Sequence, residues 1–271
     1  MSRILDYNGQ SVDRAVTVAS IIASRKNGEL LTQVTASTPD EAAAAEAAGI
    51  EMVVCMSDSV PLVREGSSKL FVTAAIDFSG AISDDDLLGT AYSALKSGAD
   101  AVITSRRLES LHRIAQEDIP VMGHLGFIPK KSTLYGGVRA VGKTADEASK
   151  LWDDFRRLED AGAFAVEAEL IPERVMSEIN KRTGLVTISL GSGRNADVMF
   201  LFTSDICGEG DHIPRHARAY GDLPALHAKV RDARAAALSA YRADVLAGQY
   251  PRDAEVATID DAELEEFVSK L

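Results

Sequence analysis

Short apolar runs alternate with segments of helical periodicity along most of this chain. The runs are rich in Val, Ile and Leu and carry few charges, which is typical of strands buried on both faces of a parallel sheet. We predict eight strands, at residues 30–35, 52–55, 70–76, 101–104, 120–123, 163–169, 185–190 and 204–207. Parallel strands that alternate with helices indicate the α/β class.

The segments between these runs carry residues that begin and end helices. Thr38 and Thr144 each stand three residues before a Glu, which is the pattern of a capping box. Gly49 and Gly162 lie just before apolar runs, where a glycine often ends a helix. We predict helices at residues 39–48, 84–96, 108–116, 144–160, 172–181 and 223–246.

The repeated order of helix, glycine and strand favours one large fold. Eight such units in about 220 residues fit a (β/α)₈ TIM barrel, and no Gly-x-Gly-x-x-Gly turn follows the first strand to suggest a doubly wound sheet. We predict a single domain over residues 1–271. Its N-terminal segment, 1–28, would contain a helix at 14–24, and its C-terminal helix would lead into an acidic tail at 252–271.

Composition narrows the class of partner. The formal net charge of −12 argues against nucleic acid, because phosphate binding needs clustered Lys and Arg. Cys55 and Cys207 both lie in apolar runs, so we expect two reduced core cysteines rather than a disulfide or a thiolate metal site. No stretch approaches the roughly 18 uncharged residues of a membrane span, and we expect a cytoplasmic protein without a membrane partner.

Candidate chemistry lies at the ends of the predicted strands. In a barrel of this kind the functional groups lie at the carboxyl ends of the strands, and Asp58, Asp77, His124, Glu169 and Asp205 stand at or just after such ends. Two simpler readings stay open. Asp58 or Asp205 could cap the next helix, and His124 could donate to a backbone carbonyl from within the core.

The strand that ends at Glu169 holds a second carboxylate. Strand alternation places Ala165, Glu167 and Glu169 on one face, and it places Phe164, Val166 and Ala168 on the other. If Glu169 points into the barrel mouth, Glu167 lies one layer deeper. A buried carboxylate must be paired, protonated or metal-bound, so either Glu167 has an inward partner or the strand leaves its register there.

Several motifs resemble those of the ketopantoate hydroxymethyltransferase (3-methyl-2-oxobutanoate hydroxymethyltransferase) family, a (β/α)₈ family of the phosphoenolpyruvate/pyruvate superfamily. They occur in order and at the spacing of the family between residues 120 and 251. The matching segments are Gly123-His124-Leu125-Gly126, Gly136-Gly137-Val138-Arg139-Ala140-Val141-Gly142-Lys143, the Glu169 strand, Gly191-Ser192-Gly193, Gly210-Asp211-His212-Ile213-Pro214-Arg215 and the run from Tyr241 to Pro251.

The resemblance implies an activity, cofactors and partners. Family enzymes transfer a one-carbon unit from 5,10-methylenetetrahydrofolate to an α-keto acid, 3-methyl-2-oxobutanoate, in pantothenate biosynthesis, with Mg²⁺ chelating the keto acid. Metal chelation acidifies the C–H bond next to the carbonyl, and a carboxylate base removes the proton. By resemblance Glu169 matches that base and His124 matches a histidine near the keto acid. The family forms large homo-oligomers, described as decamers, and we expect a homo-oligomer here.

The first half of the chain departs from the family motifs. The family has a metal-binding Gly-Asp-Ser after its second strand, whereas this chain has Met56-Ser57-Asp58-Ser59. The family's third-strand Asp falls on Ala75, with Asp77 two residues later, and its Lys-x-Glu pair is replaced by Ile103-Thr104-Ser105. A Mg²⁺ site would then depend on Asp58 and Asp77. Substrate contacts are expected from Ser57, Ser59, Arg106 and Ser192, although Arg106 and Arg107 also suit a solvated helix start.

Three hypotheses remain from the sequence. The first is a hydroxymethyltransferase with a rearranged metal site. The second is a divergent lyase or aldolase of the superfamily that acts on another α-keto or carboxylate substrate through Glu167, Glu169 and Arg106. The third is a non-catalytic paralogue that keeps the barrel for a binding role.

Overall fold

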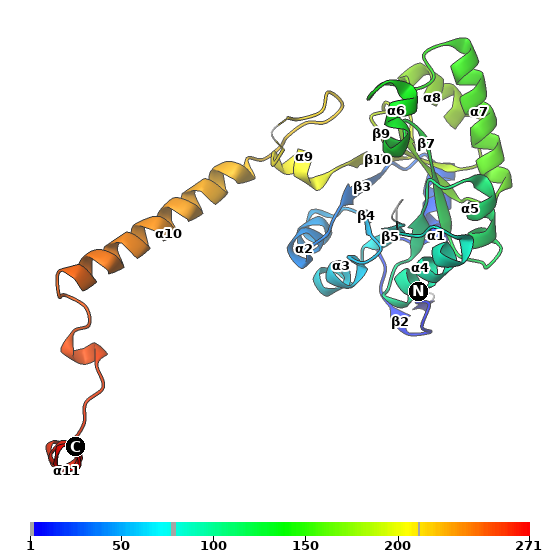
Figure 1. The fold of residues 1–271 in the computed structure, drawn as a ribbon. Helices are drawn as coiled ribbons and strands as arrows, with labels where there is room; N and C mark the ends of the chain where they lie inside the picture. Colours follow the sequence, from blue (N-terminus) through cyan, green and yellow to red (C-terminus); the bar gives the residue numbers. More distant parts are fainter. Residues whose placement is uncertain (1–2, 77–79, 211) are drawn as a thin grey trace. The chain divides into compact units, whose positions relative to one another are not determined.

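Eight parallel strands close into a barrel in the computed structural model, which describes residues 3–76, 80–210 and 212–271 (Figure 1). Neighbours in the barrel follow the chain order from β3 to β10, and β10 pairs with β3 to close the ring. The strands are β3 (Leu31–Thr35), β4 (Met52–Met56), β5 (Phe71–Ala75), β6 (Ala101–Ile103), β7 (Val121–Gly126), β8 (Ala165–Glu169), β9 (Val186–Leu190) and β10 (Val198–Leu201). The predicted (β/α)₈ barrel is confirmed.

The eighth strand differs from the prediction. We expected residues 204–207 to form it, but these residues belong to the short helix α9 (Thr203–Cys207), and β10 lies earlier in the chain. The strand ends because the Thr203 N–H donates to Thr35 Oγ1 at the end of β3, over 2.9 Å, which turns the chain away from the sheet. Asp205 therefore lies on a helix rather than at the end of a strand.

Helices follow most of the strands, close to the predicted positions. The helices that follow β3 to β8 are α2 (Pro39–Ala48), α3 (Val60–Gly66), α4 (Asp84–Lys96), α5 (Leu108–Ala115), α7 (Ala145–Asp160) and α8 (Glu173–Asn180). The short η1 (Pro129–Lys131) and α6 (Ser132–Tyr135) lie between β7 and α7. No helix separates β9 from β10, so that connection is a loop of residues 191–197.

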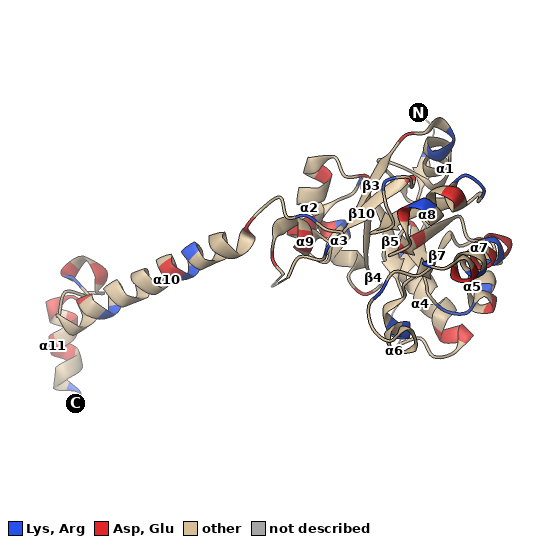
Figure 2. Ribbon diagram, turned by 90° about the horizontal axis from the view of Figure 1, so that it is seen from above, with Lys and Arg blue, Asp and Glu red and all other residues tan. Residues whose placement is uncertain are grey.

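Strand alternation divides the core into two layers. Inward side chains such as Met52, Phe71 and Ile103 fill the barrel, while outward ones such as Val53 and Val72 pack against the helices. Charged residues lie mostly on the helices and loops around the strands (Figure 2). The barrel interior is thus a packed apolar core in which each polar side chain needs a partner.

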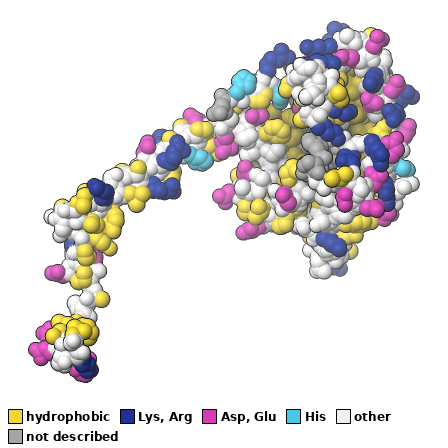
Figure 3. Space-filling view, viewed as in Figure 1, with side chains coloured by type: hydrophobic (Ala, Val, Ile, Leu, Met, Phe, Trp, Pro, Cys, Tyr) yellow, Lys and Arg dark blue, Asp and Glu magenta, His cyan; other side chains and the backbone are white. Residues whose placement is uncertain are grey.

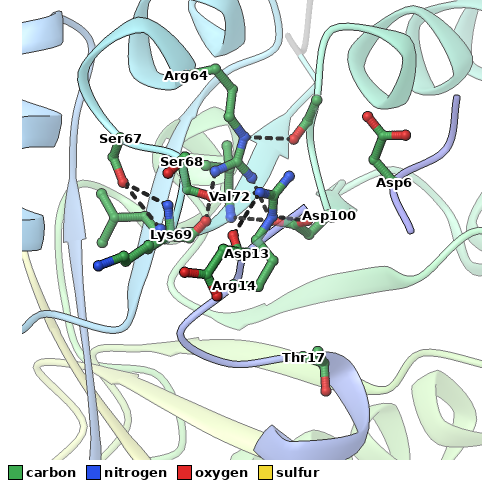
Figure 4. A network of polar contacts seen from close by, with 12 residues as sticks. Asp6, Asp13, Arg14, Thr17, Arg64, Ser67, Ser68, Lys69, Val72 and Asp100 are labelled. Carbon is green, nitrogen blue, oxygen red and sulfur yellow. Dashed lines mark hydrogen bonds and ion pairs between the residues drawn. The ribbon is translucent and has the colours of Figure 1, made fainter. Parts of the chain in front are cut away.

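The N-terminal segment closes the amino-terminal end of the barrel. The hairpin of β1 (Ile4–Leu5) and β2 (Ser11–Val12) precedes α1 (Val18–Asn27), whose Ile21 packs among the first residues of the strands. The helix was predicted at 14–24 but begins later, because Thr17 caps it. Arg14 instead forms an ion pair with Asp100, which also binds Arg64 (Figure 4).

The C-terminal segment forms a compact unit of its own. The chain divides into two compact units, Met1–Tyr220 and Gly221–Leu271. The second unit contains α10 (Leu223–Leu246), η2 (Asp253–Glu255) and α11 (Asp261–Ser269). None of its side chains is buried within the unit itself. In the parts of the chain that the structure describes, no helix has the length and apolar character to cross a bilayer.

Candidate active site

His124 and Glu169 meet at the carboxyl ends of two neighbouring strands. In the register of β7 and β8, Gly126 pairs with Glu169 and His124 pairs with Glu167. The imidazole Nε2 of His124 lies 3.0 Å from Oε2 of Glu169, and the two side chains are 11% and 13% exposed. Glu169 Oε1 has no hydrogen-bond partner among the described residues. The pair therefore leaves one carboxylate oxygen for a ligand in the barrel mouth.

The charge on His124 is set by competing effects. Burial alone would lower the pKa of His124, but the hydrogen bond that the imidazole donates to Glu169 and the negative charges of Glu167 and Glu169 outweigh it, so the pKa is raised. The imidazolium form is therefore favoured, and it donates its Nε2–H to Glu169. The pair holds a proton at a defined atom beside the open end of the barrel.

Glu167 has the inward partner that its position requires. It is 5% exposed, and its Oε1 accepts a hydrogen bond from Gln33 Nε2 over 2.8 Å. Ala165 packs in the barrel interior while Val166 and Ala168 pack on the helix side, as predicted within β8. Phe164, just before the strand, was expected on the helix side but packs against Phe71 of the interior cluster, because the alternation begins only with the strand at Ala165. Gln33 Oε1 is buried without a partner among the described residues. Sequence reasoning did not find Gln33, because nothing near it in the chain marks it as a partner of β8.

The buried carboxyl of Glu167 is expected to make stability depend on pH. Burial raises its pKa above the ordinary value of 4.5 and outweighs the lowering effects of His124 and Gln33. A carboxyl with a raised pKa gains protons on folding, so stability falls as the pH rises from 4.5 through the folded-state pKa. The raised pKa of His124 acts in the same direction.

We expect Glu167→Gln to reduce this loss of stability. The amide keeps an acceptor oxygen for Gln33 and removes the titrating group. The free energy of unfolding of the variant should therefore increase relative to that of the parent chain as the pH rises from about 5 to about 8. Urea unfolding followed by Trp152 fluorescence measures the difference. Glu265→Gln, on the exposed α11, is the matched control and should leave the pH dependence as it is. Equal slopes for Glu167→Gln and the parent chain would show that Glu167 does not titrate in this range.

The backbone beside Glu169 is held by a close approach at Gly126. Gly126 has φ +89°, and an added Cβ would lie 2.2 Å from the carbonyl oxygen of Glu169. That carbonyl accepts the N–H of Phe127 over 2.8 Å, and Leu170, the next residue, has the left-handed φ of +49°. A non-glycine residue in that conformation costs free energy and persists only where its surroundings fix it. The strand end that carries Glu169 is therefore tightly constrained.

Gly126→Ala is expected to destabilise the barrel more than Gly136→Ala. Gly136 also has a positive φ, +73°, but no atom lies within 4 Å of the position that its Cβ would take, so it isolates the conformational cost, about 1–3 kcal/mol. At Gly126 the backbone collision adds to that cost. Urea unfolding compares the two variants, and equal losses would mean that the approach to Glu169 is easily relaxed.

The glycine-rich crossover, residues 136–143, is held by contacts in its second half. The guanidinium of Arg139 forms two hydrogen bonds with the carboxylate of Glu147, which also accepts the N–H groups of Gly142 and Lys143. These contacts lower the pKa of Glu147 to about 2. The N–H of Val141 donates to the carbonyl of Leu170, directly after Glu169. The crossover thereby braces the end of β8.

Comparisons with known proteins show the family of this chain. The sequence model of the ketopantoate hydroxymethyltransferase family matches residues 55–253, which include His124, the crossover and Glu169. The chain belongs to this family. A 3-methyl-2-oxobutanoate hydroxymethyltransferase of Pyrobaculum islandicum is 33% identical over 205 residues, covering 73% of this chain and 76% of that protein. One of Chloroflexus aurantiacus is 30% identical over 275 residues, covering 92% and 95%.

A solved structure supports the fold alone. That of 2,3-dimethylmalate lyase, a member of the PEP mutase/isocitrate lyase superfamily, has a TM-score of 0.52 and 14% identity, and covers 81% of this chain and 86% of that one. The family match begins at residue 55, so Gln33 lies outside it. The partner of Glu167 comes from the part of the chain that the family match does not include.

The positions that we matched to the family motifs from the sequence hold mainly uncharged side chains. Ala75 and Ile103, which we expected at the places of a family Asp and Lys, pack with the apolar barrel interior. Asp58 is exposed, and its Oδ1 accepts a hydrogen bond from Ser59 Oγ over 3.1 Å. Ser57 donates its N–H to the carbonyl of Ala75. Asp77 lies outside the described residues, within which no group of three possible metal ligands occurs.

Arg106, Ser192 and Asp205, which the sequence also pointed to, lie in three different environments. Arg106 donates to the carbonyl of Ile82 and lines a cavity with His124. Ser192 is buried, and its hydroxyl donates to the Ala168 carbonyl and accepts the Ile171 N–H, so it holds the backbone on either side of Glu169. Asp205 is buried, with Oδ2 unpartnered among the described residues.

Proposed function

We propose that this chain is a hydroxymethyltransferase that removes a proton from the carbon beside the carbonyl of an α-keto acid and joins that carbon to a one-carbon unit. The observation that carries the proposal is the His124–Glu169 pair at the open end of the barrel, inside the family match. The names of the relatives favour 3-methyl-2-oxobutanoate as the keto acid. The family motifs favour 5,10-methylenetetrahydrofolate as the one-carbon donor, in pantothenate biosynthesis.

Each residue of the pair has a separate task. Glu169 is the base, because its Oε1 is unpartnered among the described residues and can accept the C–H proton. His124 orients the carboxylate through the Nε2–Oε2 hydrogen bond and places a positive charge where the enolate develops. Ser192 acts on Glu169 through the backbone, which it fixes from both sides. These steps use only the chain's own residues.

Mg²⁺ is part of the proposal through the family motifs. Mg²⁺ prefers oxygen ligands in an octahedron and often takes only one or two protein carboxylates, with waters and substrate oxygens in the other positions. Among the described residues, Asp58 is the carboxylate nearest in sequence to the family's metal motif, and its exposure leaves it accessible. Asp77 would be the second ligand. One described carboxylate does not build a metal site, so we assign no step of the reaction to the metal.

The C-terminal unit fits a role in self-association. Leu226, Val230, Tyr241 and Val245 recur at helical spacing along α10, and each is exposed. An amphipathic helix normally buries such a stripe against a partner. We propose that a second copy of this chain supplies it, which agrees with the expected homo-oligomer. Sedimentation of the full chain beside a Leu226→Asp/Tyr241→Asp variant measures it, and an unchanged mass would exclude this helix as the contact.

Proton exchange tests the proposed activity. The parent chain should replace the hydrogen at carbon 3 of 3-methyl-2-oxobutanoate by deuterium in heavy water, measured by proton NMR with and without Mg²⁺. Adding 5,10-methylenetetrahydrofolate should then give the hydroxymethylated keto acid. No exchange in any of these mixtures would contradict the proposal, and exchange without transfer would favour a lyase or aldolase of the same superfamily.

A further inference from the structure

A cavity beside His124 gathers basic side chains that the proposed chemistry does not use. It measures about 230 Å³ and lies between the ends of β6 and β7, the start of α5 and the segment 128–131. Its lining includes Arg106, Arg107, Lys131 and Arg157, with Glu109 and Asp154 as the acidic members. Lys and Arg side chains gather over α5 and the neighbouring η1–α6 segment (Figure 3). In an acidic chain, this local excess of positive charge needs an explanation.

Two of these cations lack a carboxylate partner among the described residues. Arg107 is held by Asp84 and Arg157 lies 3.6 Å from Asp154, so their charges are offset. Among the described residues, the side chain of Arg106 contacts only the carbonyl oxygen of Ile82, and Lys131 forms no ion pair. Their charges are available to a ligand.

The cations also repel one another. Partial burial lowers the pKa of Lys130, and the neighbouring charges of Arg106 and Lys131 lower it further. The Nζ of Lys130 donates to the carbonyl of Ser105 over 2.7 Å, which ties η1 to the end of β6. An anion bound among these side chains would offset the repulsion.

Two hydrogen-bond donors complete the cavity. The hydroxyl of Ser105 is buried and has no partner in the described part of the chain. Helix α5 begins at Leu108 with no side chain capping its first turn, since the guanidinium of Arg107, which has no acceptor, donates to Ser110 and Asp84. Uncapped N–H groups at a helix start, combined with an arginine and a hydroxyl, bind phosphate or carboxylate oxygens.

We propose that this cavity binds an anionic group, phosphate or carboxylate, through Arg106, Lys131, Ser105 and the start of α5. His124 both lines the cavity and contacts Glu169, so the two sites are adjacent. We further propose that the cavity lets the chain accept, besides 3-methyl-2-oxobutanoate, an α-keto acid with a second acidic group, which the cavity would bind. This assignment rests on the proposed function, whereas binding of an anion does not.

Inorganic phosphate tests the site without any catalytic step. Calorimetric titration of the full chain, at an ionic strength held constant with sodium chloride, should show one phosphate per chain. Arg106→Ala/Lys131→Ala should weaken its binding by at least about tenfold, since each variant removes a charged hydrogen-bond donor. Lys26→Ala/Lys96→Ala removes two exposed lysines at the ends of α1 and α4, for the same change in net charge, and should bind phosphate like the parent. Equal binding by both double variants, or none by the parent, would overturn the site.

Exchange measurements then identify the source of the anion. If the group belongs to the substrate, the parent should exchange the C3 protons of 2-oxoglutarate, and phosphate should inhibit that exchange. Arg106→Ala/Lys131→Ala should slow exchange of 2-oxoglutarate at least about tenfold more than it slows exchange of 3-methyl-2-oxobutanoate. Exchange of both acids without inhibition by phosphate would overturn the assignment to the substrate and leave the anion site. A chain that binds phosphate but exchanges neither acid would contradict the proposed function instead. Circular dichroism spectra identical to the parent's confirm that the variants are folded.

Discussion

Glu169→Gln is expected to reduce deuterium exchange at carbon 3 of 3-methyl-2-oxobutanoate by about 10²–10⁴-fold. Glutamine keeps an oxygen that can accept the His124 Nε2–H, which is 3.0 Å from the carboxylate in the parent chain, so the geometry of the barrel mouth should survive. The amide cannot take up a proton from carbon at neutral pH. Proton NMR of the keto acid in heavy water measures the loss directly.

The matched control lies four residues further along the chain. Glu173, on the exposed start of α8, forms an ion pair with Arg194. Glu173→Gln makes the same chemical change outside the barrel mouth. It should exchange the keto acid at the parent rate. Glu169→Asp retains a carboxylate but withdraws it by one methylene, so an intermediate rate is expected. If Glu169→Gln exchanges as fast as Glu173→Gln, another group is the base.

Loss of exchange should appear in kcat rather than in substrate affinity. Because the proposed role of Glu169 is proton removal, the variant loses an interaction that forms in the transition state. Binding of the keto acid, followed by calorimetry, should change little by comparison. A variant that binds the acid poorly and exchanges it normally at saturation would show instead that Glu169 holds the substrate.

Most of the barrel follows from short-range patterns in the sequence. The runs at 52–55 and 70–76 are almost uniformly apolar, which is typical of strands buried on both faces, and capping residues such as Thr38 mark the helices between the strands. The last unit could not be predicted in this way. The apolar residues of β10 follow β9 after a loop with no helix, and the five residues of α9 are too few to show a helical period.

The active site, too, could be predicted from the sequence only in part. His124 and Glu169 could be paired from the sequence because each stands at the end of a strand and β7 and β8 are neighbours in chain order. Gln33 could not be assigned to Glu167, because 134 residues separate them and their contact crosses the barrel interior. The orphaned hydroxyl of Ser105 is equally invisible, since it depends on how η1 packs against β6.

Asp100→Ala is expected to cost about 3–5 kcal/mol of the free energy of unfolding. Its Oδ1 accepts Arg14 Nε over 2.8 Å, and its Oδ2 accepts both Arg64 Nη2 over 2.5 Å and the N–H of Val72 over 2.9 Å (Figure 4). The side chains of Arg14, Arg64 and Asp100 are only 4%, 13% and 16% exposed. Removing the carboxylate leaves two buried cations next to each other without a counter-charge, and solvent can screen them only weakly.

The measurement can be confined to the barrel. Trp152 is the single tryptophan of the chain and lies on α7, so its fluorescence in urea follows the unit that contains Asp100. Asp85→Ala is the control, because it breaks an exposed ion pair: the side chains of Arg113 and Asp85 are 48% and 83% exposed. This variant should lose no more than about 1 kcal/mol of the free energy of unfolding. Equal losses for the two variants would contradict the prediction.

The ion cluster of Arg14, Arg64 and Asp100 lies far from the proposed active site, so the Asp100→Ala variant can separate stability from activity. Asp100 directly precedes β6, and Arg14 belongs to the segment that closes the amino-terminal end of the barrel, opposite the end that carries Glu169. A barrel that remains folded in Asp100→Ala should therefore exchange the keto acid at nearly the parent rate, with the loss confined to the unfolding free energy. Reduced exchange in a fully folded variant would instead show that the ion cluster sets the register of the strands on which His124 and Glu169 meet.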